Sequence, residues 1–175
     1  MHPTGPGRPP RLPTIFQKYD APVYFVTMCT TDRQPLLAAD DVHDAFRLYA
    51  ERGYREHAIA VGRYVLMPDH LHLFVSGGRD FDLQMWARGL KRAISTVVEA
   101  RVSRAVSSKP EFARETRAAT QDGIWQRGFF DHLLRSEESY AEKWEYVRQN
   151  PVRAGLVARP DEWPYQGEIV VIDLV

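Results

Sequence analysis

The apolar residues of this chain change from strand spacing to helix spacing within its first third. Val23 to Thr30 is rich in β-branched and aromatic residues, which predicts a strand. Behind the acidic pair Asp40 and Asp41, apolar residues recur at three-and-four spacing, which predicts a helix with an acidic first turn. We expect Gly53 to end this helix, because glycine disfavours the helical conformation.

Two further strands and a long helix follow. Ala58 to Met67 and His70 to Ser76 are apolar runs joined at Pro68-Asp69, and Gly77-Gly78 closes the second run, which predicts a hairpin. Helical spacing then predicts an amphipathic helix from Phe81 to about Val106. Its apolar stripe consists of Leu83, Trp86, Leu90, Ile94 and Val97.

The second half of the chain has weaker periodicity. Ser103 to Gly123 is rich in Ser, Ala and Arg, which indicates a loop or a frayed end of the helix. Ile124 to Leu134 mixes aromatic residues with glycine and predicts a strand or an irregular platform. A last helix is predicted from Ser136 to Asn150, where Pro151 follows. The order of elements predicts an α+β, ferredoxin-like split βαβ sandwich, with helices on one face of an antiparallel sheet and the last helix appended.

Length and composition predict one domain. We expect a Pro-rich arm over residues 1–20, a domain over residues 21–166 and a tail over residues 167–175. No apolar run approaches the roughly 20 residues of a membrane span, and no secretory signal is evident, so we expect a cytoplasmic protein that does not bind membranes. The single cysteine, Cys29, lies in an apolar run and is interpreted as a buried small hydrophobe.

The net charge is zero, so attraction to nucleic acid would have to come from a local patch. Such a patch is possible on the long helix, where five basic residues face one acid, Glu99. The bases are Arg88, Lys91, Arg92, Arg101 and Arg104. Taken alone, the pattern also fits an ordinary solvated helix face.

Two pairs of residues are candidates for chemistry. His70 and His72 flank one leucine in a strand, so their imidazoles point to the same face and could clamp a metal. Tyr146 and Asn150 are four residues apart in the last helix and share one face. Alternatively, Tyr146 is a core aromatic and Asn150 a helix C-cap. Two imidazoles and an amide oxygen could hold a divalent metal with open positions, and the phenol of Tyr146 would then be the nucleophile.

Three ordered motifs resemble the single-tyrosine HUH transposases, and within them the REP-associated tyrosine transposases. The motifs are Tyr64 to Gly77 with its His-Leu-His centre, Trp125 to His132, and Tyr146 to Val157. The resemblance covers most of residues 20 to 166, including Trp163-Pro164-Tyr165. It implies a metal-dependent endonuclease and strand transferase for single-stranded DNA, often beside a hairpin, that forms a 5′-phosphotyrosine.

The resemblance also assigns roles to single residues. His70 and His72 match the metal-binding pair, Tyr146 matches the attacking tyrosine, and Asn150 stands where relatives place a third polar ligand, with Gln149 as its nearby substitute. Imidazoles suit Mn²⁺ better than Mg²⁺, but phosphate oxygens and water could complete either shell, so the metal stays open. The family is compatible with a monomer or a homodimer.

In this light, basic residues along the chain become candidates for contacts with hairpin or single-stranded DNA. They are Arg8, Arg11, Arg88, Lys91, Arg92, Arg127, Arg135, Arg148 and Arg153, together with His132. Trp125, Phe129 and Phe130 could stack on bases or pack in the core.

Two rival functions stay open beside the transposase. One is a regulatory protein that binds hairpin DNA without cutting it, although binding alone needs neither the histidines nor the tyrosine. The other is a metal enzyme acting on a small molecule, which would leave the basic helix and the last motif unexplained. If Tyr146 is not the nucleophile, Tyr140 is the first alternative.

Overall fold

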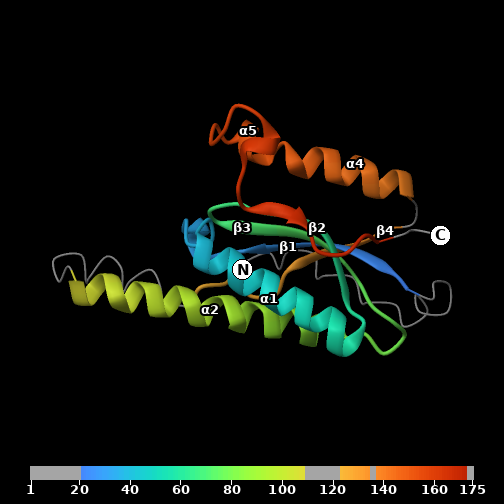
Figure 1. Ribbon diagram of the computed structural model, residues 1–175, viewed down its shortest axis with the longest axis horizontal. Helices are drawn as coiled ribbons and strands as arrows, with labels where there is room; N and C mark the ends of the chain where they lie inside the picture. Colours follow the sequence, from blue (N-terminus) through green and yellow to red (C-terminus); the bar gives the residue numbers. More distant parts are fainter. Residues whose placement is uncertain (1–20, 109–122, 135–136, 173–175) are drawn as a thin grey trace, which may run out of the picture.

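Five antiparallel strands form a single sheet in the order β4-β1-β3-β2-β5 in a computed structural model (Figure 1). The structure describes residues 21–108, 123–134 and 137–172. The strands are β1 (Val23–Cys29), β2 (Ala60–Leu66), β3 (His70–Ser76), β4 (Phe130–Leu134) and β5 (Gln166–Glu168). The first four strands have the order 4-1-3-2 expected of a split βαβ sandwich, which confirms the predicted α+β fold.

Helices cover both faces of the sheet (Figure 1). On one face lie α1 (Asp40–His57) and α2 (Leu83–Ser108), and on the other lie α4 (Glu137–Arg148) and α5 (Asn150–Arg153). A short 3₁₀ turn, η2 (Thr31–Arg33), follows β1, and another, η4 (Pro160–Glu162), precedes β5. Within the described part of the chain, no helix combines the length and the apolar character that crossing a membrane requires.

Alternation along β3 separates the core from the opposite face. Leu71, Leu73 and Val75 are fully buried against α1 and α2, in a cluster with Phe46 and Leu90. The intervening residues, His70, His72 and Phe74, therefore point toward α4, and Phe74 contacts the Tyr140 ring there at 4.3 Å between centroids. The strand thus supplies the main core with one face and leaves both histidines on the other.

The first helix extends one turn beyond the predicted end. Gly53 lies inside α1, where it is buried close to the indole of Trp86, and the helix ends only at His57. Ala58 adopts the left-handed conformation with φ of 52°, and its N–H donates to the carbonyls of Gly53 and Tyr54. The prediction that Gly53 ends the helix is wrong, because packing between α1 and α2 outweighs a propensity cost of about 1 kcal/mol.

The C-terminal part also differs from expectation. The predicted last helix breaks after Arg148, and a second short helix, α5, begins at Asn150. Residues after 166, expected to form a tail, continue into β5, which pairs with β2. The buried Trp163 leads the chain back to the sheet, because its indole N–H donates to the carbonyl of Leu66 at 2.9 Å.

Candidate functional site

The two histidines of β3 form the centre of the site. Their rings meet edge to face with centroids 4.7 Å apart, and the ring of His72 stacks on Phe25 of β1 at 5.4 Å. Residues paired across antiparallel strands share a face, so the pairing of Thr27 with His72 places Thr27 beside them. The site is therefore built on the middle strands of the sheet, which hold its side chains in fixed positions.

Each histidine is oriented through its Nδ1 atom. His70 Nδ1 lies 2.6 Å from the Asp69 carboxylate, and His72 Nδ1 lies 2.8 Å from the Thr27 hydroxyl. The short contact to a carboxylate assigns the proton of His70 to Nδ1, where it donates to Asp69. For His72, donation from Nδ1 to Thr27 is the tautomer that frees Nε2. Outer partners of this kind are typical of histidines that bind metal through the other nitrogen.

Burial keeps these imidazoles neutral. It lowers the pKa of His72 to about 3, with further contributions from the charges of His70, Arg33 and Arg153. Burial also lowers the pKa of His70, against the opposing effect of Asp69. Neutral imidazole is the form that binds a metal, so the two Nε2 atoms fit a divalent ion. Within residues 21–108, 123–134 and 137–172, the histidine pair included, no three His, Cys, Asp or Glu side chains gather as a metal cage, so the two imidazoles would need other ligands to complete a metal shell.

The helix that carries Tyr146 lies over the same face of the sheet. Lys143 of α4 places its ammonium 5.7 Å from the centroid of Phe25, the ring that stacks on His72. The next turn of α4 packs Val147 against Val65 and Met67, which also face away from the main core. The structure thus brings the tyrosine helix to the histidine side, where the side chain of Tyr146 is 64% exposed.

Arg153 joins Tyr146 to Asn150. Its guanidinium lies 4.2 Å from the centroid of the Tyr146 ring, and Nη2 donates to the Tyr146 carbonyl at 2.6 Å. The same Nη2 also donates to the side-chain oxygen of Asn150. The expected proximity of Tyr146 and Asn150 is therefore present, although Asn150 begins α5 and is not the C-cap of the preceding helix. The Asn150 oxygen already has a cationic partner, which any metal would have to share or replace.

The neighbouring side chains of α4 have internal partners. Gln149 donates its amide to Glu145 at 3.2 Å, and Arg148 pairs with the same carboxylate at 2.6 Å. Tyr140 is buried, and its hydroxyl accepts from the backbone N–H of Arg63. Tyr140 is therefore a packing residue, and Tyr146 is the exposed phenol of this helix.

The predicted DNA-binding residues are distributed unequally. Arg88 and Arg92 are exposed on α2, and Arg127 is exposed in the segment before β4. Lys91 is instead half-buried and donates to the carbonyls of Gln126 and Gly128, so its ammonium holds that segment in place. Burial lowers the pKa of Lys91 accordingly. Arg8, Arg11 and Arg135 lie outside the described residues.

The aromatic residues near β4 divide between core and surface. Trp125 and Phe129 pack against the main core, which confirms the packing alternative for both. Phe130 is 71% exposed and pairs with Thr27, so it lies on the histidine face next to the row that contains His72. His132, paired with Phe25, is exposed on the same face. Phe130 is the one of these three aromatics whose ring is available for stacking.

Three residues at the site were not singled out from the sequence: Thr27, Asp69 and Arg33. Asp69 directly precedes His70 in a turn, a position that could have indicated a partner for the imidazole. The position of Thr27 beside His72 follows from the strand register alone, and the position of Arg33 follows from the conformation of η2. No sequence pattern reveals either of these.

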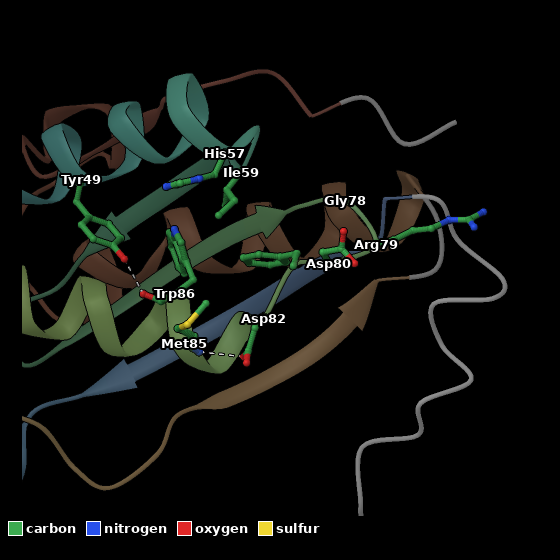
Figure 2. Close-up of a pocket in the computed structure, with 10 residues that line it drawn as sticks. Tyr49, His57, Ile59, Gly78, Arg79, Asp80, Asp82, Met85 and Trp86 are labelled. Carbon is green, nitrogen blue, oxygen red and sulfur yellow. Dashed lines mark hydrogen bonds between the residues drawn. The ribbon is translucent and has the colours of Figure 1, made fainter.

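A cavity of about 510 Å³ lies at the other end of β3, between the end of α1 and the start of α2 (Figure 2). Tyr49, Trp86, Phe81 and Met85 line it, and the Trp86 indole N–H has no acceptor among the described residues. None of the residues predicted to act in chemistry or DNA binding lines this cavity. The candidate site is thus the histidine face of the sheet and not this pocket.

Comparisons with known proteins agree with the motifs. A family model described as transposase, IS200-like, matches residues 19–150. The chain is similar to a Haemophilus influenzae protein named for the REP-associated tyrosine transposases, with 26% identity over 144 residues, 82% of this chain and 77% of that protein. It is also similar to a REP-associated tyrosine transposase of Escherichia coli, with 25% identity over 63% of this chain and 55% of that one.

A solved structure has the same fold. It is described as the REP-associated tyrosine transposase bound to a REP hairpin, and it matches with a TM-score of 0.61 and 20% identity, over 83% of this chain and 75% of that chain. At this identity the likeness establishes the sheet and helix arrangement.

Proposed function

The chain belongs to the IS200-like transposase family, and we propose that it cuts and rejoins single-stranded DNA beside a hairpin through a covalent bond to Tyr146. As a member of this family it is a transposase, which is an enzyme. The proposal concerns the chemistry: a divalent metal, Mg²⁺ or Mn²⁺, a tyrosine nucleophile, and DNA with a REP-like hairpin as substrate.

One observation carries the proposal. The two oriented, neutral imidazoles and the helix that carries the exposed phenol of Tyr146 lie on the same side of the sheet, although His72 and Tyr146 are 74 positions apart in the chain. Binding DNA alone requires neither group. A small-molecule enzyme would place its substrate in an enclosed cavity, whereas the cavity described above is lined by none of these residues and the exposed rings of Tyr146 and Phe130 are accessible to a polynucleotide.

The metal would be held by His70 Nε2 and His72 Nε2, with Asn150 as the candidate third ligand. Such an ion supplies Lewis-acid polarisation of a phosphate oxygen and stabilises the charge that develops during displacement. Thr27 and Asp69 fix the orientation of the two imidazoles, so the protein presents both nitrogens without rearrangement of the strand.

Tyr146 performs the displacement. Its hydroxyl oxygen attacks the phosphorus, a P–O bond to the tyrosine forms, the P–O3′ bond breaks, and the 3′ oxygen leaves as a hydroxyl that takes up a proton. The 5′-phosphotyrosine keeps the energy of the broken bond, so a second 3′-hydroxyl can attack it and rejoin strands without ATP. Arg153 orients the nucleophile by covering the ring of Tyr146 and binding its carbonyl.

Exposed residues around this face supply contacts for the DNA. Arg127, Arg88 and Arg92 are candidates for phosphate contacts. Phe130 and His132 lie on the histidine face, and the exposed ring of Phe130 fits stacking on an unpaired base. The name of the solved structure records a REP hairpin bound to that protein, which supports a hairpin as the probe to test first.

The decisive experiment detects the covalent adduct. A hairpin oligonucleotide with single-stranded flanks, labelled on both sides of the hairpin, is incubated with the protein and Mn²⁺ or Mg²⁺, and the products are separated under denaturing conditions. We expect a cleaved strand and a protein-linked strand that depend on the metal. Tyr146→Phe should abolish the adduct while leaving DNA affinity close to that of the wild type.

A matched control is Tyr54→Phe, which alters an exposed tyrosine on α1 far from the histidines. This variant should form the adduct at the wild-type level. An adduct that persists in Tyr146→Phe would place the nucleophile elsewhere. Binding without any cleavage, over a broad set of hairpins and flanks, would favour a regulatory protein that binds hairpin DNA.

A further inference from the structure

An arginine next to the histidines is held in a costly backbone conformation. Asp32 and Arg33, in the turn η2 after β1, both have left-handed φ angles of 51° and 56°. Residues other than glycine rarely adopt this region, and two in succession require support from their surroundings. For Arg33 that support comes from contacts of its side chain at the start of β3.

Two of the three nitrogens of the Arg33 guanidinium have partners. Its Nε lies 2.7 Å from the Asp69 carboxylate, and its Nη1 lies 3.0 Å from the sulfur of Cys29. The carboxylate of Asp69 forms an ion pair with Arg33 through one oxygen and accepts from His70 through the other. Asp69 therefore ties the position of the guanidinium to the position of the imidazole.

The third nitrogen of the guanidinium, Nη2, remains open. Nη2 approaches His70 Nδ1 at 3.4 Å, but that nitrogen carries the proton it donates to Asp69 and cannot accept a second one. Among the described residues, Nη2 thus has no good acceptor, and half of the side chain (51%) is exposed. Nη2 carries two N–H groups in the plane of the guanidinium, and arginine donors of this kind are suited to phosphate oxygens.

We propose that Arg33 binds the phosphate that is cleaved, with Asp69 and the left-handed turn holding its guanidinium beside the two histidines. The inference rests on the proposed function, since it assigns a further residue to the same site. Arg33 becomes a catalytic residue in the strict sense, because it touches the reacting phosphate and can share the negative charge that grows there during displacement.

The variant Arg33→Gly tests this without the usual risk of unfolding. Glycine removes the guanidinium and also suits the left-handed conformation, so the turn should be at least as stable as in the wild type. Arg33→Lys keeps the charge but loses the paired donors. Arg52→Ala is the matched control, because it removes an exposed arginine on α1 whose ion pair among the described residues is with Glu56.

Binding is measured by fluorescence anisotropy in the Tyr146→Phe background with EDTA, so that neither cleavage nor metal affects the readout. The probe is the hairpin oligonucleotide that the wild type cleaves. For Arg33→Gly we expect affinity about tenfold weaker and a log–log salt slope reduced by about 0.7, the value of one phosphate contact on a single strand. The affinity of Arg33→Lys should fall between those of Arg33→Gly and the Tyr146→Phe parent. The affinity of Arg52→Ala should equal that of the parent.

A second oligonucleotide locates the contact. It carries an uncharged methylphosphonate at the cleaved position. With this oligonucleotide, Arg33→Gly and its parent should bind with nearly the same affinity, because the charge that Arg33 contacts is gone. A penalty that persists with the methylphosphonate, or an Arg33→Gly variant that binds the unmodified oligonucleotide as tightly as the parent, would overturn the role of Arg33. In both cases cleavage by the wild type would still support the proposed function, whereas absence of cleavage and adduct in the wild type would contradict that function itself.

Discussion

Replacing Thr27 by valine should weaken metal binding while leaving the fold intact. The hydroxyl of Thr27 lies 2.8 Å from His72 Nδ1, and valine removes it without changing the branched shape that suits a strand. Loss of an outer partner of a metal-binding histidine typically lowers metal affinity about 10- to 100-fold. Since a tenfold change corresponds to about 1.4 kcal/mol, this agrees with the roughly 1–3 kcal/mol for leaving a buried donor unpaired.

The stacking of His72 on Phe25 does not depend on the hydroxyl, so the ring should stay near its position and the protein should remain folded. Isothermal titration of Mn²⁺ into the two proteins measures the difference, with urea unfolding as the check on stability. Thr96→Val is the control, because that hydroxyl donates to the Arg92 carbonyl on the exposed side of α2, away from the histidines. An unchanged dissociation constant for Mn²⁺ in folded Thr27→Val would refute the orienting role of Thr27.

Three other predictions concern the surroundings of the site. Phe130→Ala should weaken binding of single-stranded DNA by about 1–3 kcal/mol, measured by anisotropy, with an unchanged melting temperature because the ring is exposed; equal affinity would exclude base stacking there. Lys91→Met should destabilise the segment before β4, which would appear as faster hydrogen exchange in residues 124–129. Unchanged exchange rates in this segment would contradict the structural role of Lys91. Burial lowers the pKa of His43, so the folded protein binds fewer protons than the unfolded chain and loses stability as the pH falls below about 6.5. The urea midpoint of His43→Gln should therefore depend less on pH between about pH 7.5 and 5.5 than that of the wild type. An equally steep pH dependence would contradict this.

The regular part of the fold was predictable because its signals are local. Alternation along β3 and three-and-four spacing along α2 each follow from neighbours in the sequence, and both elements have nearly the predicted bounds. β5 was missed because Gln166-Gly167-Glu168 has no apolar alternation; its pairing depends on Trp163, which anchors the chain to β2. The end of α1 was misplaced since Gly53 is kept helical by contact with another helix.

The shared face of the two histidines was predictable from the sequence, but the way the site is assembled from distant elements was only partly so. His-Leu-His specifies a shared face for His70 and His72, whatever the rest of the chain does. The side of the sheet on which the Tyr146 helix lies depends on packing between elements distant in sequence, and only the family resemblance indicated it. The role of Arg33 depends on two left-handed residues and on a carboxylate 36 positions later, for which no sequence pattern exists.

The division of β3 into a core face and a histidine face has a consequence for how this gene tolerates change. Inserting or deleting one residue at the start of β3 would exchange the two faces, placing both imidazoles in the core and turning Leu71 and Leu73 toward α4. In a library of insertions and deletions, lesions in this strand should therefore abolish solubility and DNA cleavage together. Point substitutions at Tyr146, which lies on the surface of its helix, should separate the two and yield soluble, inactive protein. Tyr146 should thus be replaceable without loss of the folded protein, whereas the register of the histidine strand should not be changeable.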